Sequence, residues 1–263
     1  MMTRTTHIGS LPFLCINEAI EFNKKLSLPA LSTLPKINPA EFMLEQIAFG
    51  IVGARVLDYK ICIDKLEFVK DFKLEFLMLK EFKKQFKDQS IKWQIIGPIT
   101  LMKSFESPLE SSQKELLLTW YHSLILEFYL DIKKYFNNIL FILDEPLFDI
   151  HFKSTLLSTL KFLENTNMET GFHCCSKLKI CDVDVINPDY LSIDCALYNE
   201  KELKIMSSKK TNLISGVVNT VTGEITCNIS EILKDSRYLS PACGLAFSKI
   251  KVCHKALRNL CHL

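Results

Sequence analysis

The stretch ILFILDEP, residues 139–146, is a short apolar run that ends in two acidic residues and a proline. Short apolar runs of this kind predict strands, and the longer amphipathic stretches between them predict helices. Working outward from this run, the predicted strands are Thr6–Leu11, Ala30–Leu34, Arg55–Leu57, Lys92–Ile96, Ile139–Leu143, Thr170–His173, Tyr190–Ile193, Asn212–Val218 and Tyr238–Leu239.

Two amphipathic stretches predict the clearest helices. Apolar residues recur at three- and four-residue intervals from Gln113 to Phe136, and a second stripe runs from Phe72 to Phe86. Further helix starts are predicted at Asn38-Pro39, Ser111 and Ser230. This alternation favours an α/β fold, a single (β/α)8 TIM barrel over residues 1–263. A doubly wound sheet is the alternative, but no G-x-G-x-x-G motif follows any predicted strand.

Composition excludes several classes of protein. The 32 basic residues nearly balance the 30 acidic ones, and the lysines are scattered, so no nucleic-acid partner is expected. Four arginines are too few for a site that clamps several carboxylates. Neither a signal peptide nor an apolar run of membrane-spanning length is found, so no membrane partner is expected. Ten cysteines without export then indicate reduced thiols in the cytoplasm.

Polar residues gather where the predicted strands end, which is where the active site of such a barrel lies. His173 and Cys175 are two apart at one strand end, so both face the same side and can reach one ion. Cys243 can add a second sulfur, and Asp194 an oxygen, from two other strand ends. This set predicts a zinc site. The alternative is that the cysteines are small buried hydrophobic residues.

A sulfur-rich site with one exchangeable position indicates a particular chemistry. The cation lowers the pKa of a substrate thiol, which then binds as the nucleophilic thiolate. Hydrolysis at zinc favours histidine and carboxylate ligands, as in H-E-x-x-H, and that motif is absent. The ligand set therefore favours alkylation of a thiol.

Six segments, in this order, carry a resemblance to a known family. They are Thr6–Pro12 (THIGSLP), Gly97–Thr100 (GPIT), Leu143–Pro146 (LDEP), Gly171–Cys175 (GFHCC), Leu191–Asp194 (LSID) and Ser240–Leu245 (SPACGL). Together they resemble the catalytic barrel of cobalamin-independent methionine synthase and its short relatives. That family belongs to a superfamily shared with uroporphyrinogen decarboxylase.

The resemblance implies a role for each matching residue. His173, Cys175 and Cys243 match the family's zinc ligands, while Asp194 falls where methionine synthase has a ligating glutamate. The shorter side chain of Asp194 leaves open whether it touches the metal or a neighbouring ligand.

The resemblance also implies a binding site for an amino acid. Asp144 matches the aspartate that holds the amino group of homocysteine, and Ile8, Gly9 and Ser10 match the turn that takes its carboxylate. The alternatives are a helix-start turn at Asp144-Glu145-Pro146 and an ordinary strand-to-helix turn at Gly9-Ser10. No residue is assigned a separate catalytic role.

The implied function is transfer of a methyl group to a small thiol such as homocysteine. The second, N-terminal barrel of methionine synthase and its glutamate-rich turn have no match here, so the donor is open between a methyl-corrinoid, free or on a partner corrinoid protein, and a methylfolate. The alternatives are a uroporphyrinogen decarboxylase-like enzyme, whose arginine-rich N-terminal motif is missing, and a non-catalytic zinc- or corrinoid-binding module.

Overall fold

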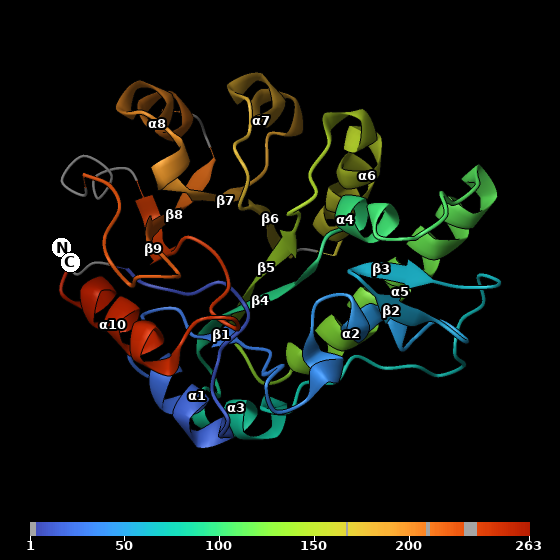
Figure 1. Cartoon of the computed structure of the whole chain (residues 1–263), viewed down its shortest axis with the longest axis horizontal. Helices are drawn as coiled ribbons and strands as arrows, with labels where there is room; N and C mark the ends of the chain where they lie inside the picture. The colour runs from blue at the N-terminus through green and yellow to red at the C-terminus, as the bar shows by residue number, and fades with distance from the viewer. Residues whose placement is uncertain (1–3, 167, 209–210, 229–235) are drawn as a thin grey trace.

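A computed structural model describes residues 4–166, 168–208, 211–228 and 236–263. It is an α/β fold built on a curled sheet of seven parallel strands, with the order β1-β4-β5-β6-β7-β8-β9 (Figure 1). These strands are β1 (Ala30–Leu31), β4 (Ser90–Ile96), β5 (Asn138–Asp144), β6 (Glu169–Cys174), β7 (Tyr190–Asp194), β8 (Asn212–Val218) and β9 (Ser236–Pro241). Each is parallel to its neighbour, as in a TIM barrel, and each falls on a predicted strand.

The sheet is not closed into a continuous ladder among the described residues. The segment predicted as the first strand, Thr6–Leu11, is not a strand, and its neighbourhood contributes only isolated bridges. Thr5 pairs with Leu239 in β9, and Ser10 pairs with Thr33 beyond β1. Between these two bridges, Gly9 interrupts the extended backbone at a φ of +37°, a conformation that favours glycine.

The prediction that Arg55–Leu57 is a strand of the barrel is wrong. These residues form β2, which pairs antiparallel with β3 (Lys60–Cys62) outside the main sheet. Asp58 and Tyr59 join the two strands with φ angles of 46° and 60°. Two successive positive φ angles are typical of a tight hairpin turn, which returns the chain at once and prevents a crossover to a parallel strand.

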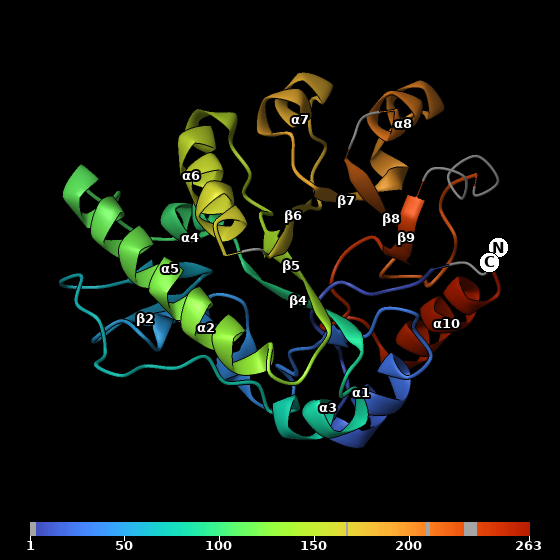
Figure 2. The same cartoon turned by 180° about the vertical axis from the view of Figure 1, so that it is seen from behind.

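Helices lie around the outside of the sheet (Figures 1 and 2). They are α1 (Ile16–Asn23), α2 (Glu45–Ala48), α3 (Leu79–Gln85), α4 (Pro98–Lys103), α5 (Ser111–Ile132), α6 (Lys153–Glu164), α7 (Ile180–Ile186), α8 (Glu200–Ser207) and α10 (Ile250–Cys261), with 3-10 turns η1 (Pro39–Glu41), η2 (Ile150–Phe152) and η3 (Cys195–Leu197). None of the helices in the described ranges combines the length and apolar character that a membrane crossing requires.

The helix predictions were confirmed in part. The predicted helix from Gln113 forms as α5, with Glu110 rather than Ser111 as its N-cap. Asn38 caps η1 through its side chain, whereas the start predicted at Ser230 lies outside the described residues. The stripe from Phe72 is helical only from Leu79.

The aromatic residues before α3 recur at helical spacing because of burial, although this segment is not a helix. Phe76 is buried and packs on Phe128 of α5, with the ring centroids 5.2 Å apart. The same α5 ring contacts Trp93 in β4, which in turn contacts Phe141 in β5. A non-helical segment that packs against a helix can thus bury phenylalanines at helical spacing.

Candidate metal centre

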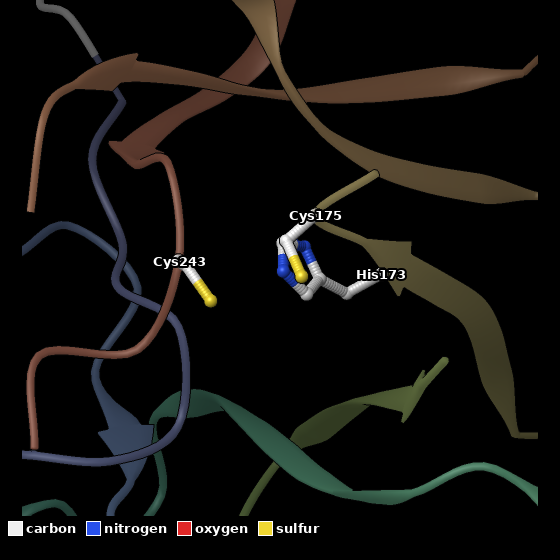
Figure 3. A group of neighbouring side chains, drawn as sticks. All are labelled: His173, Cys175 and Cys243. Atoms are coloured by element: carbon white, nitrogen blue, oxygen red, sulfur yellow. The ribbon is translucent and has the colours of Figure 1, made fainter. Parts of the chain in front are cut away.

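Three side chains from two distant parts of the chain meet at the end of the sheet. His173 lies in β6, Cys175 directly follows that strand, and Cys243 follows β9. One ligand atom from each lies within 4.8 Å of the other two. Figure 3 shows the Cys243 side chain pointing across an open space toward His173 and Cys175. The structure therefore brings together the imidazole and both sulfurs that the sequence predicted.

His173 is oriented by a neighbouring strand. The ring is fully buried, and its Nδ1 lies 2.9 Å from the hydroxyl of Ser192, its register partner in β7. The other ring nitrogen, Nε2, is buried and makes no hydrogen bond within the described structure. A buried nitrogen that lacks a partner is costly unless something binds it, so this atom fits a metal ion.

The two cysteines of the cluster differ in acidity. The Cys243 thiol hydrogen-bonds to Cys175, and this bond, followed by the adjoining His173 ring, lowers the pKa of Cys175. The pKa of Cys243 is raised because it faces the resulting thiolate and is largely buried. Cys175 is thus the more acidic thiol of the pair, and it lies beside the buried imidazole of His173. Thiolate and imidazole are the ligands that zinc prefers, so the donor set fits that cation.

Cys174 faces away from this cluster, as alternation along a strand predicts. It is fully buried, and burial raises the pKa of its thiol to about 11. The thiols of the adjacent residues Cys174 and Cys175 therefore lie in different environments.

Asp194 does not join the cluster. It lies at the end of β7, and its Oδ1 accepts a hydrogen bond from the Ala196 backbone N–H at 3.0 Å, which caps η3. Burial raises the pKa of this carboxyl group. The hydrogen bond of this carboxylate is therefore a capping one, while His173 and Cys175 lie near enough to affect its pKa.

The residues predicted to bind substrate line a cavity of about 230 Å³ beside the cluster. Its wall includes Ile8, Gly9, Ser10, Asp144, Cys175 and Cys243. Residues from four of the segments that carry the resemblance thus line one cavity, and both sulfurs are among them.

Asp144 is held by a buried polar chain that the sequence analysis missed. The Gln94 side-chain amide donates to Asp144 Oδ2 at 2.8 Å, and Lys92 Nζ donates to Gln94 Oε1 at 2.5 Å. Burial raises the pKa of Asp144 and lowers that of Lys92 to about 7. Two polar residues at alternate positions of the apolar run 91–96 were the available signal, because alternate residues share a face of the strand.

Gln46 of α2 is a second functional candidate that the sequence analysis missed. Its side chain lines the cavity and is 7% exposed, and its Nε2 is buried without a hydrogen-bond partner in the described structure. An amide donor left unpaired in a cavity wall is suited to an anionic ligand group. No local sequence pattern marks this residue.

Glu145 has a structural role. Its carboxylate accepts hydrogen bonds from the backbone N–H groups of Ile99 and Thr100, at 2.9 and 2.7 Å, in the first turn of α4. A Cβ at Gly97 would lie 2.3 Å from the Glu145 carboxyl carbon, so only glycine fits there. The GPIT and LDEP segments are therefore one packing unit.

A wider apolar cavity of about 620 Å³ adjoins the first and shares Phe42, Met43, Pro146 and Phe247 with it. The rings of Phe42 and Phe247 stack at 5.7 Å, and Phe247 is 77% exposed. Tyr59 of the β2–β3 hairpin, 79% exposed, lies in the same wall. The hairpin that leaves the sheet thus helps to build the entrance to the cluster.

Comparison with known proteins gives a likeness in structure. No protein-family model matches the sequence, and no curated protein matches it. A solved structure of a B12-independent methionine synthase from Shewanella sp. W3-18-1, in complex with selenomethionine, matches with a TM-score of 0.70 and 14% sequence identity. The match covers 99% of this chain and 96% of that one. At this identity the likeness establishes a shared fold.

Proposed function

We propose that this chain is a zinc-dependent methyltransferase that moves a methyl group onto a small thiol such as homocysteine. The observation that carries the proposal is the meeting of His173, Cys175 and Cys243 beside a cavity. The shared fold supports it, because the similar protein is a methionine synthase that was solved with selenomethionine. The isolated bridges of the segment before Leu11 further suggest a variant (β/α)8 barrel, closed by a poorly paired first strand.

His173 Nε2 and the sulfurs of Cys175 and Cys243 would hold the zinc ion. When bound, zinc would lower the pKa of the substrate thiol and present it as a thiolate. Asp194 caps η3 through the Ala196 N–H and is not among the side chains whose ligand atoms meet. We therefore propose three protein ligands, which leaves a position for the substrate.

The chain's own residues would orient the substrate. Asp144 faces the cavity, where a substrate ammonium group would favour its charged form, and the hydrogen bond from Gln94 offsets part of the rise in pKa that burial causes. The unpaired amide of Gln46 would donate to the substrate carboxylate, with Ile8, Gly9 and Ser10 forming more of the wall. An amino acid held by both its ammonium and its carboxylate group would have its side-chain sulfur fixed in one direction.

The wider apolar cavity would admit the methyl donor. In the transfer, a bond forms between the substrate sulfur and the methyl carbon while the bond between that carbon and the donor breaks, so donor and thiol must be in line. The exposed rings of Phe247 and Tyr59 suit a bulky donor with a flat apolar face. A methyl-corrinoid, free or on a corrinoid protein, and a methylfolate both meet this description.

The test is methyl transfer by purified, zinc-loaded protein, with homocysteine as acceptor and methylcobalamin or methyltetrahydrofolate as donor. We expect methionine to form with one donor. Asp144→Asn should raise the KM for homocysteine by about 10- to 100-fold, since a hydrogen bond to a charged group contributes about 1.5–3 kcal/mol. A thiol without an amino group should be unaffected.

Asp189→Asn, at an exposed aspartate before β7, is the matched control and should behave as the unaltered protein. Absence of transfer from either donor to any thiol, with zinc bound, would contradict the proposal and leave a binding module.

A further inference from the structure

A second pair of cysteines meets elsewhere on the same side of the sheet. Cys195 is the first residue of η3, after β7, and Cys227 lies in the connection that follows β8. Their thiol groups hydrogen-bond to each other. Both line a cavity of about 180 Å³ whose wall contains none of the residues of the candidate metal centre. The cavity wall is completed by η3, α8 and β8, with Tyr198, Leu203 and Leu213 among its residues.

The two thiols differ in access to solvent. Cys195 is 1% exposed, whereas Cys227 is half-buried and packs against the edge of the core. An oxidant that enters the cavity therefore reaches Cys227 first, and a second thiol already lies in contact behind it. A reactive thiol next to a buried partner is the arrangement by which oxidation ends in a disulfide.

The pair differs from the candidate metal centre in its neighbours. Among the described residues, the one set of three or more histidine, cysteine or acidic ligand atoms close enough for an ion is the His173, Cys175 and Cys243 set. Within the part of the chain that the structure describes, no third ligand atom of this kind completes a set with Cys195 and Cys227. Two sulfurs alone are a poor site for zinc, which takes four ligands, so the contact between them calls for other chemistry.

We propose that Cys195 and Cys227 are a modification site, a dithiol that a peroxide entering their cavity converts into a reversible disulfide. The Cys227 thiolate attacks one peroxide oxygen, the O–O bond breaks, and sulfenic acid and water form when hydrogen peroxide is the oxidant. The Cys195 sulfur then attacks the sulfenic sulfur, the S–O bond breaks, and a second water leaves. Two thiols lose two electrons in total, and one peroxide is reduced to two waters.

The disulfide would connect the segments that follow two neighbouring strands. It closes a loop from residue 195 to residue 227, which contains all of α8 and β8. Both thiols are contributed by segments of irregular backbone or short 3-10 turn, which can adjust to disulfide geometry more easily than the middle of a strand.

The test is disulfide mapping on the full chain. The protein is treated with hydrogen peroxide, free thiols are blocked with N-ethylmaleimide, and peptides are analysed by mass spectrometry without reduction. We expect one peptide pair joined through Cys195 and Cys227 that is lost after dithiothreitol. Recovery of both residues as maleimide adducts, or of Cys227 as sulfinic acid beside free Cys195, would overturn the proposal.

Cysteine variants separate the formation of the sulfenic acid from the formation of the disulfide. In Cys195→Ser, the sulfenic acid at Cys227 should persist and be trapped by dimedone, because the thiol that consumes it is gone. Loss of the exposed thiol in Cys15→Ser should leave the cross-link unchanged. The cross-link should also form in Cys175→Ser with Cys243→Ser, so its failure is distinguishable from a failure of the proposed methyl transfer. No dimedone adduct at Cys227 in folded Cys195→Ser protein would contradict the order of the steps.

Discussion

Two pairs of cysteines lie at the ends of strands in this sheet, and their surroundings give them different chemistry. Cys175 and Cys243 meet beside His173, whose Nε2 is buried without a partner. Cys195 and Cys227 meet beside a cavity with no third ligand among the residues described. Thiol contact alone thus does not define a metal site. The oriented imidazole distinguishes the two pairs.

The two pairs also differ in what lies near them. The polar chain of Lys92, Gln94 and Asp144 reaches the cavity of the first pair. Near the second pair, the hydroxyl of Ser215 contacts Ser236 and Cys195. The buried polar chain thus adjoins the first pair, whereas serine hydroxyl groups adjoin the second.

The largest expected effect is the loss of zinc affinity when both cysteines of the first pair are replaced. Cys175→Ser with Cys243→Ser should lower zinc affinity at least about 10³-fold, because complete structural zinc sites bind with about 10–16 kcal/mol and two of three protein ligands are lost. Cys195→Ser with Cys227→Ser should bind zinc as the unaltered protein does. Metal analysis and a competitive chelator measure both, and equal loss in the two double variants would show that the pairs do not differ.

A smaller effect tests the orientation of His173. Ser192→Ala removes the hydroxyl at Nδ1 and should lower zinc affinity by about 10- to 100-fold, the usual cost of losing a partner that orients a metal ligand. Ser215→Ala is the matched control, since that serine is equally buried but adjoins the other thiol pair. Chelator competition measures the zinc affinity of each variant relative to that of the unaltered protein. An unchanged affinity in Ser192→Ala would mean that packing alone orients the ring.

Burial of Lys92 should make the free energy of unfolding depend on pH. Its pKa is lowered from 10.5 to about 7 by burial, so between these pH values the unfolded chain binds more protons than the folded one. The free energy of unfolding should then rise with pH from about 7 to 10.5, by at most about 1.4 kcal/mol per pH unit from this group.

Lys92→Met should remove this slope, while Lys177→Met, at an exposed lysine, should retain it. Urea unfolding of zinc-free protein at pH 7, 8 and 9 measures the slope. A slope identical in Lys92→Met and the unaltered protein would contradict the assignment.

The smallest effect concerns Gln46. Gln46→Leu should raise the KM for homocysteine roughly tenfold, as expected for one hydrogen bond of about 1.5 kcal/mol to a carboxylate. Gln89→Leu, at an exposed position, should leave it unchanged. Steady-state kinetics with homocysteine and with a thiol lacking the carboxylate measure the difference. An equal KM change for both thiols would show that Gln46 only shapes the cavity.

The sequence predicted the parallel strands of the sheet better than the region between β1 and β4. Ile139–Leu143 and Asn212–Val218 are apolar runs in strands buried on both faces, so composition alone identifies them. Arg55–Leu57 also contains β-forming residues, but the chain reverses direction at Asp58-Tyr59. Both of these residues have a positive φ angle, which the sequence pattern did not predict.

Part of the candidate site was predictable for a simple reason. His173 lies in β6, Cys175 directly follows it and Cys243 follows β9, so alternation and strand ends were enough to predict that these side chains lie near one another. Gln46 was missed because a lone glutamine on a short helix has no distinguishing pattern.

By itself the sequence determined where the buried strands lie and which candidate metal ligands stand near their ends, because both depend on residues close together in the chain. The tertiary structure decided which thiols meet. The contacts of Cys175 with Cys243 and of Cys195 with Cys227 join residues far apart in the chain, and no periodicity encodes them. It also decided that Lys92 is buried beneath Asp144, since burial depends on how the whole sheet curls.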